Sequence, residues 1–195
     1  MTVKDRTYYQ HNTPSEKSSN TKTLELPRDF VLPWLQPGQS VLDCGCGLGT
    51  ITLDIAQRIF PGQVTGIDLD ANKLIKAERL AFGLEQVNAS FRKADIYQLP
   101  FGDHSFDLVF ASALFQNLTD PAAALSEVRR VLRPDGLIAL GSLEPSPDSG
   151  LLSAQSLTYW LTQGGFHLVA EETHEKPTFS NAGATNQRWR SFVAL

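Results

Sequence analysis

Short apolar runs and longer segments with helical spacing alternate along the middle of the chain. After a first apolar run at 40–43, apolar residues including Ile51, Ile55 and Ile59 recur every three or four positions, which is the period of a helix with one buried face. The pattern then repeats. Strands are predicted at 40–43, 64–68, 89–94, 106–111 and 137–141, and helices at 50–60, 71–83, 121–132 and 153–163. Such alternation is typical of an α/β fold with a doubly wound, mostly parallel sheet.

Capping residues mark several of the helix ends. Asp70 precedes the second helix and can cap it, and Gly83 can end it, since these residue types favour the two ends of a helix. Asp120-Pro121 combines a capping side chain with proline at the first helical position. Arg129, Arg130 and Arg133 are interpreted as a solvated helix face and its end.

The last part of the chain follows a different pattern. Phe166–Thr173 and Arg188–Ala194 are predicted to form two strands, and the segment between them lacks a helical period. Parallel neighbours need a long crossover, usually a helix, so this final pair is expected to be antiparallel. The prediction is therefore a seven-stranded sheet with an antiparallel last strand. Trp189 could pack in this sheet or contribute to a homodimer face.

The first residues differ from the rest. Residues 1–23 form a polar arm with no hydrophobic period, and residues 24–195 are predicted to form a single domain. A short helix at 24–35 would be interrupted by Pro27 and Pro33. The arm, which carries Tyr8, Tyr9 and His11, could be disordered or could close over a site as a lid.

Length and composition limit the class of protein. The chain has 195 residues, 42% of them hydrophobic, and a formal net charge of −4, which suits one globular domain. The mild acidity, without a long basic run, argues against non-specific nucleic-acid binding. No run of 18 apolar residues predicts a membrane span, and the start lacks the apolar core of a signal peptide. The expected location is cytoplasmic.

Cysteine and histidine usage excludes two further classes. The only cysteines, Cys44 and Cys46, lie in one tripeptide and cannot staple distant segments. A zinc site needs more ligands, yet the four histidines are scattered along the chain. We therefore expect no metal site.

A glycine loop joins the first strand to the first helix. Its sequence from Asp43 to Gly49 is Asp-x-Gly-x-Gly-x-Gly, and Thr50 stands where a dinucleotide fingerprint would place its third glycine. The Asp43 carboxylate would repel a pyrophosphate but can receive an ammonium group directly or through water. The loop therefore favours a zwitterionic or cationic ligand, unless Asp43 only braces the loop.

Two more acids end the next two strands. Asp68, about twenty residues beyond the glycines, can accept from both hydroxyls of a ribose, although it could also be a capping or surface acid. Asp95 can accept from the exocyclic amine of adenine while the N–H of Ile96 donates to a ring nitrogen. Because the carboxyl ends of parallel strands share one edge, the three acids are expected to line one crevice.

At this point the chain resembles the class I S-adenosylmethionine-dependent methyltransferases, over about 37–141 and in its two closing strands. VLDCGCGLG looks like the first motif of that family, GIDLD like its ribose-binding segment and ADIYQLPF like its adenine-contacting segment. The stretch FDLVFASALFQNLTDPAAALSEVRRVLRPDGLIAL is similar to the small-molecule branch, which includes quinone C-methyltransferases. The resemblance implies a Rossmann-like methyltransferase fold that ends in an antiparallel strand, with S-adenosylmethionine as cofactor.

By that resemblance, the loop holds the methionine end of the cofactor, Asp68 holds the ribose, Leu69 packs on adenine, and Asp95 with Ile96 recognises adenine. The implied cofactor-binding residues are Asp43, Gly45, Cys46, Gly47, Gly49, Asp68, Leu69, Asp95, Ile96 and Ala111. For the methyl acceptor we expect walls formed by Ser112, Phe115, Gln116 and the segment 143–152, although Phe115 could equally pack in the core.

The chain also departs from the family. Many relatives carry His after the fourth strand, where this chain has Gln116-Asn117. No general base is obvious, so no catalytic residue is assigned. The Asn/Asp-Pro-Pro-Tyr signature of amino-group DNA methyltransferases is absent, and so are the extra cysteines used in arsenic methylation.

Three functions compete at this stage. The first is methyl transfer to a small organic molecule, because positioning alone can supply much of such catalysis. The second is a non-catalytic binding protein for S-adenosylmethionine or S-adenosylhomocysteine, since a fold does not fix an activity. The third, a nicotinamide-dependent oxidoreductase, is disfavoured by Asp43, by Thr50 and by the lack of a Tyr-x-x-x-Lys pair.

Overall fold

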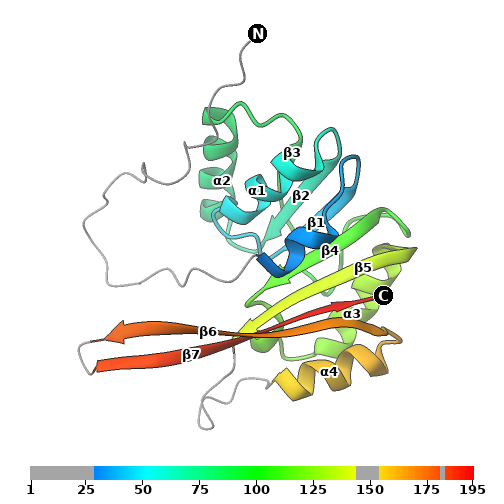
Figure 1. Ribbon diagram of the computed structural model, residues 1–195. Coiled ribbons are helices and arrows are strands. Elements are labelled where there is room, and N and C mark those ends of the chain that lie inside the picture. The colour runs from blue at the N-terminus through cyan, green and yellow to red at the C-terminus, as the bar shows by residue number, and fades with distance from the viewer. Residues whose placement is uncertain (1–28, 144–153, 181–182) are drawn as a thin grey trace.

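The computed structural model describes residues 29–143, 154–180 and 183–195. Its strands form one seven-stranded sheet in the order β3-β2-β1-β4-β5-β7-β6 (Figure 1). The strands are β1 Ser40–Cys44, β2 Gln63–Asp68, β3 Ala89–Lys93, β4 Phe106–Ser112, β5 Leu132–Leu143, β6 Leu168–Ser180 and β7 Gly183–Ala194. The helices are η1 Asp29–Trp34, α1 Thr50–Ile59, α2 Ala71–Gly83, η2 Phe115–Asn117, α3 Pro121–Val131 and α4 Ala154–Gln163, of which η1 and η2 are 3-10 helices.

The predicted mostly parallel sheet is confirmed. β1 pairs in parallel with β2 and β4, β2 with β3, and β4 with β5. The carboxyl ends of β1, β2 and β3 therefore meet at one edge, next to that of β4. β7 is antiparallel to both of its neighbours, β5 and β6, which confirms the antiparallel last strand.

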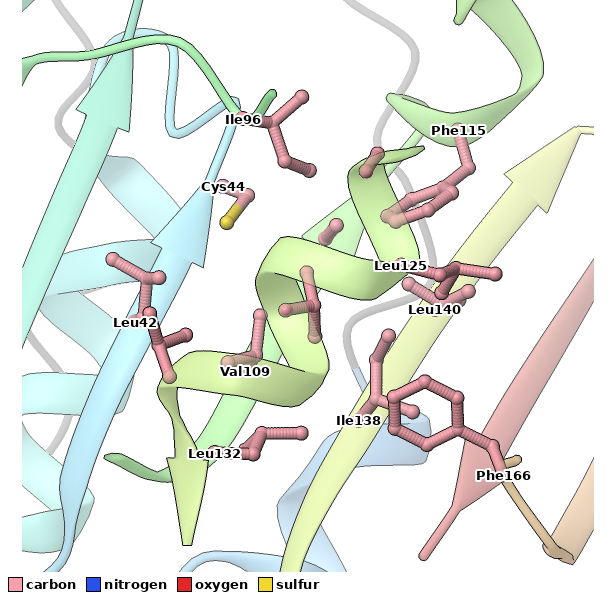
Figure 2. Packing of buried hydrophobic residues seen from close by; sticks show 14 of the residues in the cluster. Leu42, Cys44, Ile96, Val109, Phe115, Leu125, Leu132, Ile138, Leu140 and Phe166 are labelled. Atoms are coloured by element: carbon pink, nitrogen blue, oxygen red, sulfur yellow. The ribbon is translucent and has the colours of Figure 1, made fainter. Parts of the chain in front are cut away.

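Two apolar layers cover the sheet. On one face, α1 and η1 contribute Ile55, Ile59 and Val31 to a buried cluster with β1, β2 and β4. On the other face, α3 packs Leu125 and Val128 against β1, β4 and β5, together with residues of α4 (Figure 2). Both faces are thus closed, which is why the parallel strands have nearly continuous apolar sequences.

The helix caps agree with the sequence prediction. The Asp70 side chain accepts from the Asn72 and Lys73 amides, and α2 ends at Gly83. Asp120 accepts from the Ala123 amide, with Pro121 at the start of α3. The short segment before β1 forms the 3-10 helix η1. Pro33, one of the two prolines predicted to interrupt a helix in this segment, lies inside η1.

The bounds of three predicted strands change most. β5 begins at Leu132 instead of residue 137, and its register with β4 shifts between Phe106 and Leu108, so that Arg133–Gly136 bulges out of the ladder. β6 begins at Leu168, not Phe166, and runs on to Ser180, while β7 starts at Gly183. The β6–β7 hairpin therefore extends beyond the last pair with β5, Leu143–Trp189, at the carboxyl edge of the sheet (Figure 1). Trp189 is buried in this sheet.

An ion-pair hub fixes the segment after β3 onto α3. Arg130 donates to the carboxylates of Glu127 and Asp103 and to the carbonyls of Leu99 and Phe101. The Leu99 amide in turn donates to Glu127 at 2.8 Å. The interpretation of Arg130 as part of a solvated helix face is therefore incomplete: its side chain is 32% exposed, but its guanidinium also donates to the carbonyls of a neighbouring loop.

Some predictions lie outside the described residues: the arm 1–23, the first residues of the segment 24–35, and 144–152 of the proposed acceptor wall. In the described ranges, no helix is long and apolar enough to cross a membrane. The same ranges contain no group of three or more potential metal ligands.

Candidate functional site

The glycine loop turns between β1 and α1 with three left-handed residues. Gly45, Gly47 and Gly49 have φ values of 76°, 56° and 77°, a region that side chains disfavour and glycine does not. A Cβ on Gly49 would also lie 2.7 Å from the Phe91 ring and 2.8 Å from Ala77 Cβ. The space beside Gly47 is open, since a Cβ there would meet no atom within 4 Å. The loop is therefore closed on its sheet side at Gly49 and open at Gly47.

The loop amides donate to protein oxygens. The Gly45 and Cys46 amides both donate to the Ile67 carbonyl, at 2.8 and 2.9 Å. The Gly47 amide donates to Asp68 Oδ2 at 3.0 Å. A phosphate-binding loop instead aims such amides at its ligand. The amides of Gly45, Cys46 and Gly47 are thus used by acceptors of the protein itself.

Asp43 lies at the end of β1 and is almost fully buried, with 2% of its surface exposed. Its Oδ2 accepts from the Thr52 hydroxyl of α1 at 2.5 Å. Burial raises the pKa of Asp43 to about 7, and the nearby Asp68 adds to the increase, while the Thr52 hydrogen bond opposes it. A cation arriving beside Asp43 would favour the ionised form.

Asp68 links β2, the glycine loop and α2. Its two carboxylate oxygens accept from the amides of Gly47 and Asp70, the latter at 2.9 Å. Each carboxylate oxygen retains a second acceptor site, so ribose hydroxyls could still donate to it. The next residue, Leu69, is 62% exposed. An exposed leucine beside a carboxylate is suited to an aromatic ring whose sugar is held by that acid.

The third acid, Asp95, is exposed and starts a turn after β3. Its Oδ1 accepts from the Tyr97 amide at 3.0 Å, and its carbonyl accepts from Gln98. The side chain of Ile96 is buried in the core near Cys44 (Figure 2). Ile96 can therefore contribute to a ligand site through its backbone only, as the predicted hydrogen bond to adenine requires.

The remaining predicted cofactor residues contribute shape. The Cys46 side chain lies against Gly66, since a Cβ added at Gly66 would lie 2.9 Å from the Cys46 sulfur. Burial and the carboxylates of Asp43 and Asp68 raise the pKa of the Cys46 thiol, so the thiol stays neutral. Ala111 is buried in the core at the end of β4.

The three predicted acceptor residues are divided between the two faces of the sheet. The Phe115 ring packs in the core beside Leu125 and Leu140 and is 2% exposed (Figure 2). Gln116 is buried and accepts from the Ser142 hydroxyl at 3.1 Å. The Ser112 hydroxyl faces Gly141 and Phe30, and it has no hydrogen-bond partner in the described part of the chain. Phe115 thus has the packing role that the sequence left open.

Sequence reasoning missed three residues that shape the site. Thr52 lies nine positions after Asp43 and carried no motif of its own. Ala113 has a positive φ of 54°, and the Asn117 side chain donates to its carbonyl at 2.7 Å. Such a conformation at a non-glycine residue has no sequence signal, because only the surrounding hydrogen bonds select it.

Comparison with known proteins identifies the family to which the chain belongs. A family model described as "Methyltransferase domain" matches residues 42–140, just over half of the chain. A demethylmenaquinone methyltransferase of Staphylococcus aureus is 33% identical over 179 residues, covering 82% of this chain and 73% of that protein. The chain therefore belongs to the methyltransferase-domain family, within the class I S-adenosylmethionine-dependent methyltransferases.

A second relative and two solved structures are also similar to this chain. An uncharacterized methyltransferase of Schizosaccharomyces pombe is 34% identical over 142 residues, 69% of this chain and 51% of that protein. The chain thus spans about half the length of that relative. An S-adenosylmethionine-dependent methyltransferase from Aquifex aeolicus has the same fold, with a TM-score of 0.71 and 20% identity over 87% of this chain and 89% of that one. A [4+2]-cyclase has it too, with a TM-score of 0.73 and 21% identity over 85% and 79%.

The residues present fit the cofactor that this family implies. The open side of Gly47 leaves room for a ligand to approach the backbone, Asp68 offers acceptors to a ribose, and Leu69 offers an exposed apolar surface to adenine. The buried Asp43 suits the positive charge of an amino acid end. These residues lie at the carboxyl ends of the neighbouring strands β1 and β2 and in the loop between β1 and α1.

Proposed function

We propose that this chain transfers a methyl group from S-adenosylmethionine to a small organic acceptor. The observation that carries the proposal is the buried carboxyl group of Asp43 at the end of β1, where the glycine loop begins. Its carboxylate would repel a pyrophosphate and can instead receive the ammonium group of a methionine end. A sulfonium cofactor with a ribose and no phosphate meets no such repulsion.

The proposed roles of the cofactor residues are those that the family implies, and the geometry described above supports them. Asp43 and the glycine loop hold the methionine end, Asp68 accepts from the ribose hydroxyls, and Asp95 with the Ile96 amide recognises adenine while Leu69 packs on its ring. When bound, the cofactor supplies an activated methyl group. The protein then has to align the acceptor and exclude water, and alignment alone is worth up to roughly 7–11 kcal/mol in well-oriented systems.

The acceptor is proposed to lie beyond the carboxyl ends of β4 and β5. The hydroxyl of Ser112 and the side chains of Gln116 and Ser142, near those ends, are neutral and buried. Because they place no charge there, we propose an uncharged or weakly acidic acceptor. The named activity of the Staphylococcus aureus relative makes quinones and related phenols the first acceptors to test.

A direct assay tests the proposal. Purified protein is incubated with S-adenosylmethionine carrying a labelled methyl group and a panel of quinols, phenols and small amines, and the label is followed by mass spectrometry. We expect transfer to at least one acceptor, and that transfer should be lost in Asp68→Ala. A cofactor that binds but is never turned over would favour the alternative, a non-catalytic binding protein. That alternative is consistent with the absence of a histidine shortly after β4, where the chain has Gln116-Asn117.

A further inference from the structure

The turn that follows β4 contains a residue in a conformation its side chain disfavours. Ala113 has a φ of 54°, and among the described non-glycine residues only Glu85 and His104 share a positive φ. Neither of those two residues lies at the end of β4, next to the glycine loop. A left-handed alanine persists only where the surrounding contacts hold it.

Two short hydrogen bonds hold the Ala113 backbone from opposite sides. Its amide donates to the Gly141 carbonyl of β5 at 2.7 Å. Its carbonyl accepts from the Asn117 side-chain amide at 2.7 Å. The first bond comes from a strand and any side chain at 113 would keep it. The second depends on the Asn117 amide group alone.

The position of this turn sets the position of Leu114. Three carbons of the Leu114 side chain lie 3.5 Å from the point where a Cβ on Gly45 would be. Leu114 therefore covers the first glycine of the loop that is proposed to hold the methionine end. Asn117 contributes a second bond here, since its own amide donates to the Leu114 carbonyl at 2.9 Å. A rotation of the 113–114 peptide would move Leu114 away from the loop.

We propose that Asn117 is a positioning residue for the cofactor site. Its side-chain amide stabilises the left-handed backbone at Ala113, and that backbone places Leu114 against Gly45. This inference rests on the proposed function, because it assumes that the cofactor lies on the glycine loop. Asn117 acts through Leu114 and touches neither the cofactor nor the acceptor in this account.

A double-mutant cycle tests the inference with S-adenosylhomocysteine as the probe, so that no acceptor is needed. Asn117→Ala should weaken its binding about three- to tenfold, the loss associated with one hydrogen bond. Glycine adopts the left-handed conformation without penalty. Ala113→Gly should therefore leave affinity within about twofold of the wild type, and it should restore most of the lost affinity when combined with Asn117→Ala.

Two further variants complete the experiment. Leu114→Ala should weaken binding to a similar extent as Asn117→Ala, whereas Gln63→Ala, on the exposed start of β2 at the opposite edge, should not. Wild-type affinity in Asn117→Ala, or a double variant no better than Asn117→Ala alone, would overturn this inference and leave the proposed function standing. A wild-type protein that does not bind S-adenosylhomocysteine would overturn the proposed function, and the inference with it.

Discussion

The carboxyl edge of the sheet has two halves with different chemistry. The cofactor half, at the ends of β1, β2 and β3, carries three carboxylates, two of which accept from backbone amides. The acceptor half, at the ends of β4 and β5, carries the neutral groups of Ser112, Gln116 and Ser142. Under the proposed function, the first half would hold the charged, hydroxyl-bearing cofactor through these carboxylates. The second half offers no charged group to an acceptor among the residues named.

The two halves also differ in what holds their backbone. Gly49 and Gly66 are packed so closely that a single added methyl group would collide with Phe91. The turn after β4 is held by hydrogen bonds instead, from the Asn117 side chain to the Ala113 carbonyl and from the Ala113 amide to the Gly141 carbonyl. A substitution at Gly49 or Gly66 therefore adds a collision, whereas one at Asn117 removes a hydrogen bond.

The largest expected effect tests the rigidity of the cofactor half. Gly49→Ala and Gly47→Ala impose the same left-handed strain, but only the first adds a steric collision. We expect Gly49→Ala to lower the free energy of unfolding by about 3 kcal/mol, from strain and overpacking together. Gly47→Ala should cost about 1 kcal/mol. Chemical denaturation measures both, and equal losses would contradict the packing described at Gly49.

The next effect tests the charge of the cofactor half. Asp68→Asn should weaken S-adenosylhomocysteine binding by about 1.5–3 kcal/mol, the scale of a hydrogen bond to a charged group. Asp70→Asn removes a neighbouring charge and keeps the helix cap, because asparagine caps as well as aspartate. It is therefore the matched control and should bind normally. Equal affinities in calorimetric titrations of both variants would remove Asp68 from the site.

A smaller effect follows from the pKa of Asp43, which burial raises from 3.8 to about 7. Asp43 therefore contributes most to stability below pH 3.8, and this contribution is lost as pH rises through about 7. The cofactor's ammonium group needs the ionised form, so affinity for S-adenosylhomocysteine should rise about tenfold from pH 6 to pH 8. Asp43→Asn should abolish that rise. A wild-type affinity independent of pH would show that the ammonium group does not contact Asp43.

The smallest effect concerns the support of the adenine segment. Arg130→Lys keeps the charge but cannot reproduce four partners with one ammonium group. We expect a loss of about 1 kcal/mol in stability, reduced by partial exposure, and weaker binding of adenosine. Arg79→Lys on the exposed side of α2 is the control. If the two variants were equally stable and bound adenosine equally, Arg130 would not position the segment 95–103.

The contrast between the two halves also explains what could be predicted from sequence. The strands, caps and three acids of the cofactor half follow from local signals: apolar runs, Asp70 before a helix, and an acid at each strand end. The length of the β6–β7 hairpin could not be predicted, because its outer residues pair only with each other. Arg130 and the Ala113 turn were missed for a related reason. Their structure depends on partners far away in sequence, such as Leu99 and Gly141.

The central claim is that the cofactor half binds the adenosyl amino acid of S-adenosylmethionine or of its demethylated product and excludes a dinucleotide. Calorimetric titration of the purified protein with S-adenosylhomocysteine and with NAD, under the same conditions, tests it most directly. We predict one saturable site for S-adenosylhomocysteine and no binding of NAD; in an unfolding experiment, the same ligand at 100 times its Kd should add about 2.7 kcal/mol of stability. Saturable binding of NAD without binding of S-adenosylhomocysteine would contradict the account of the glycine loop and of Asp43.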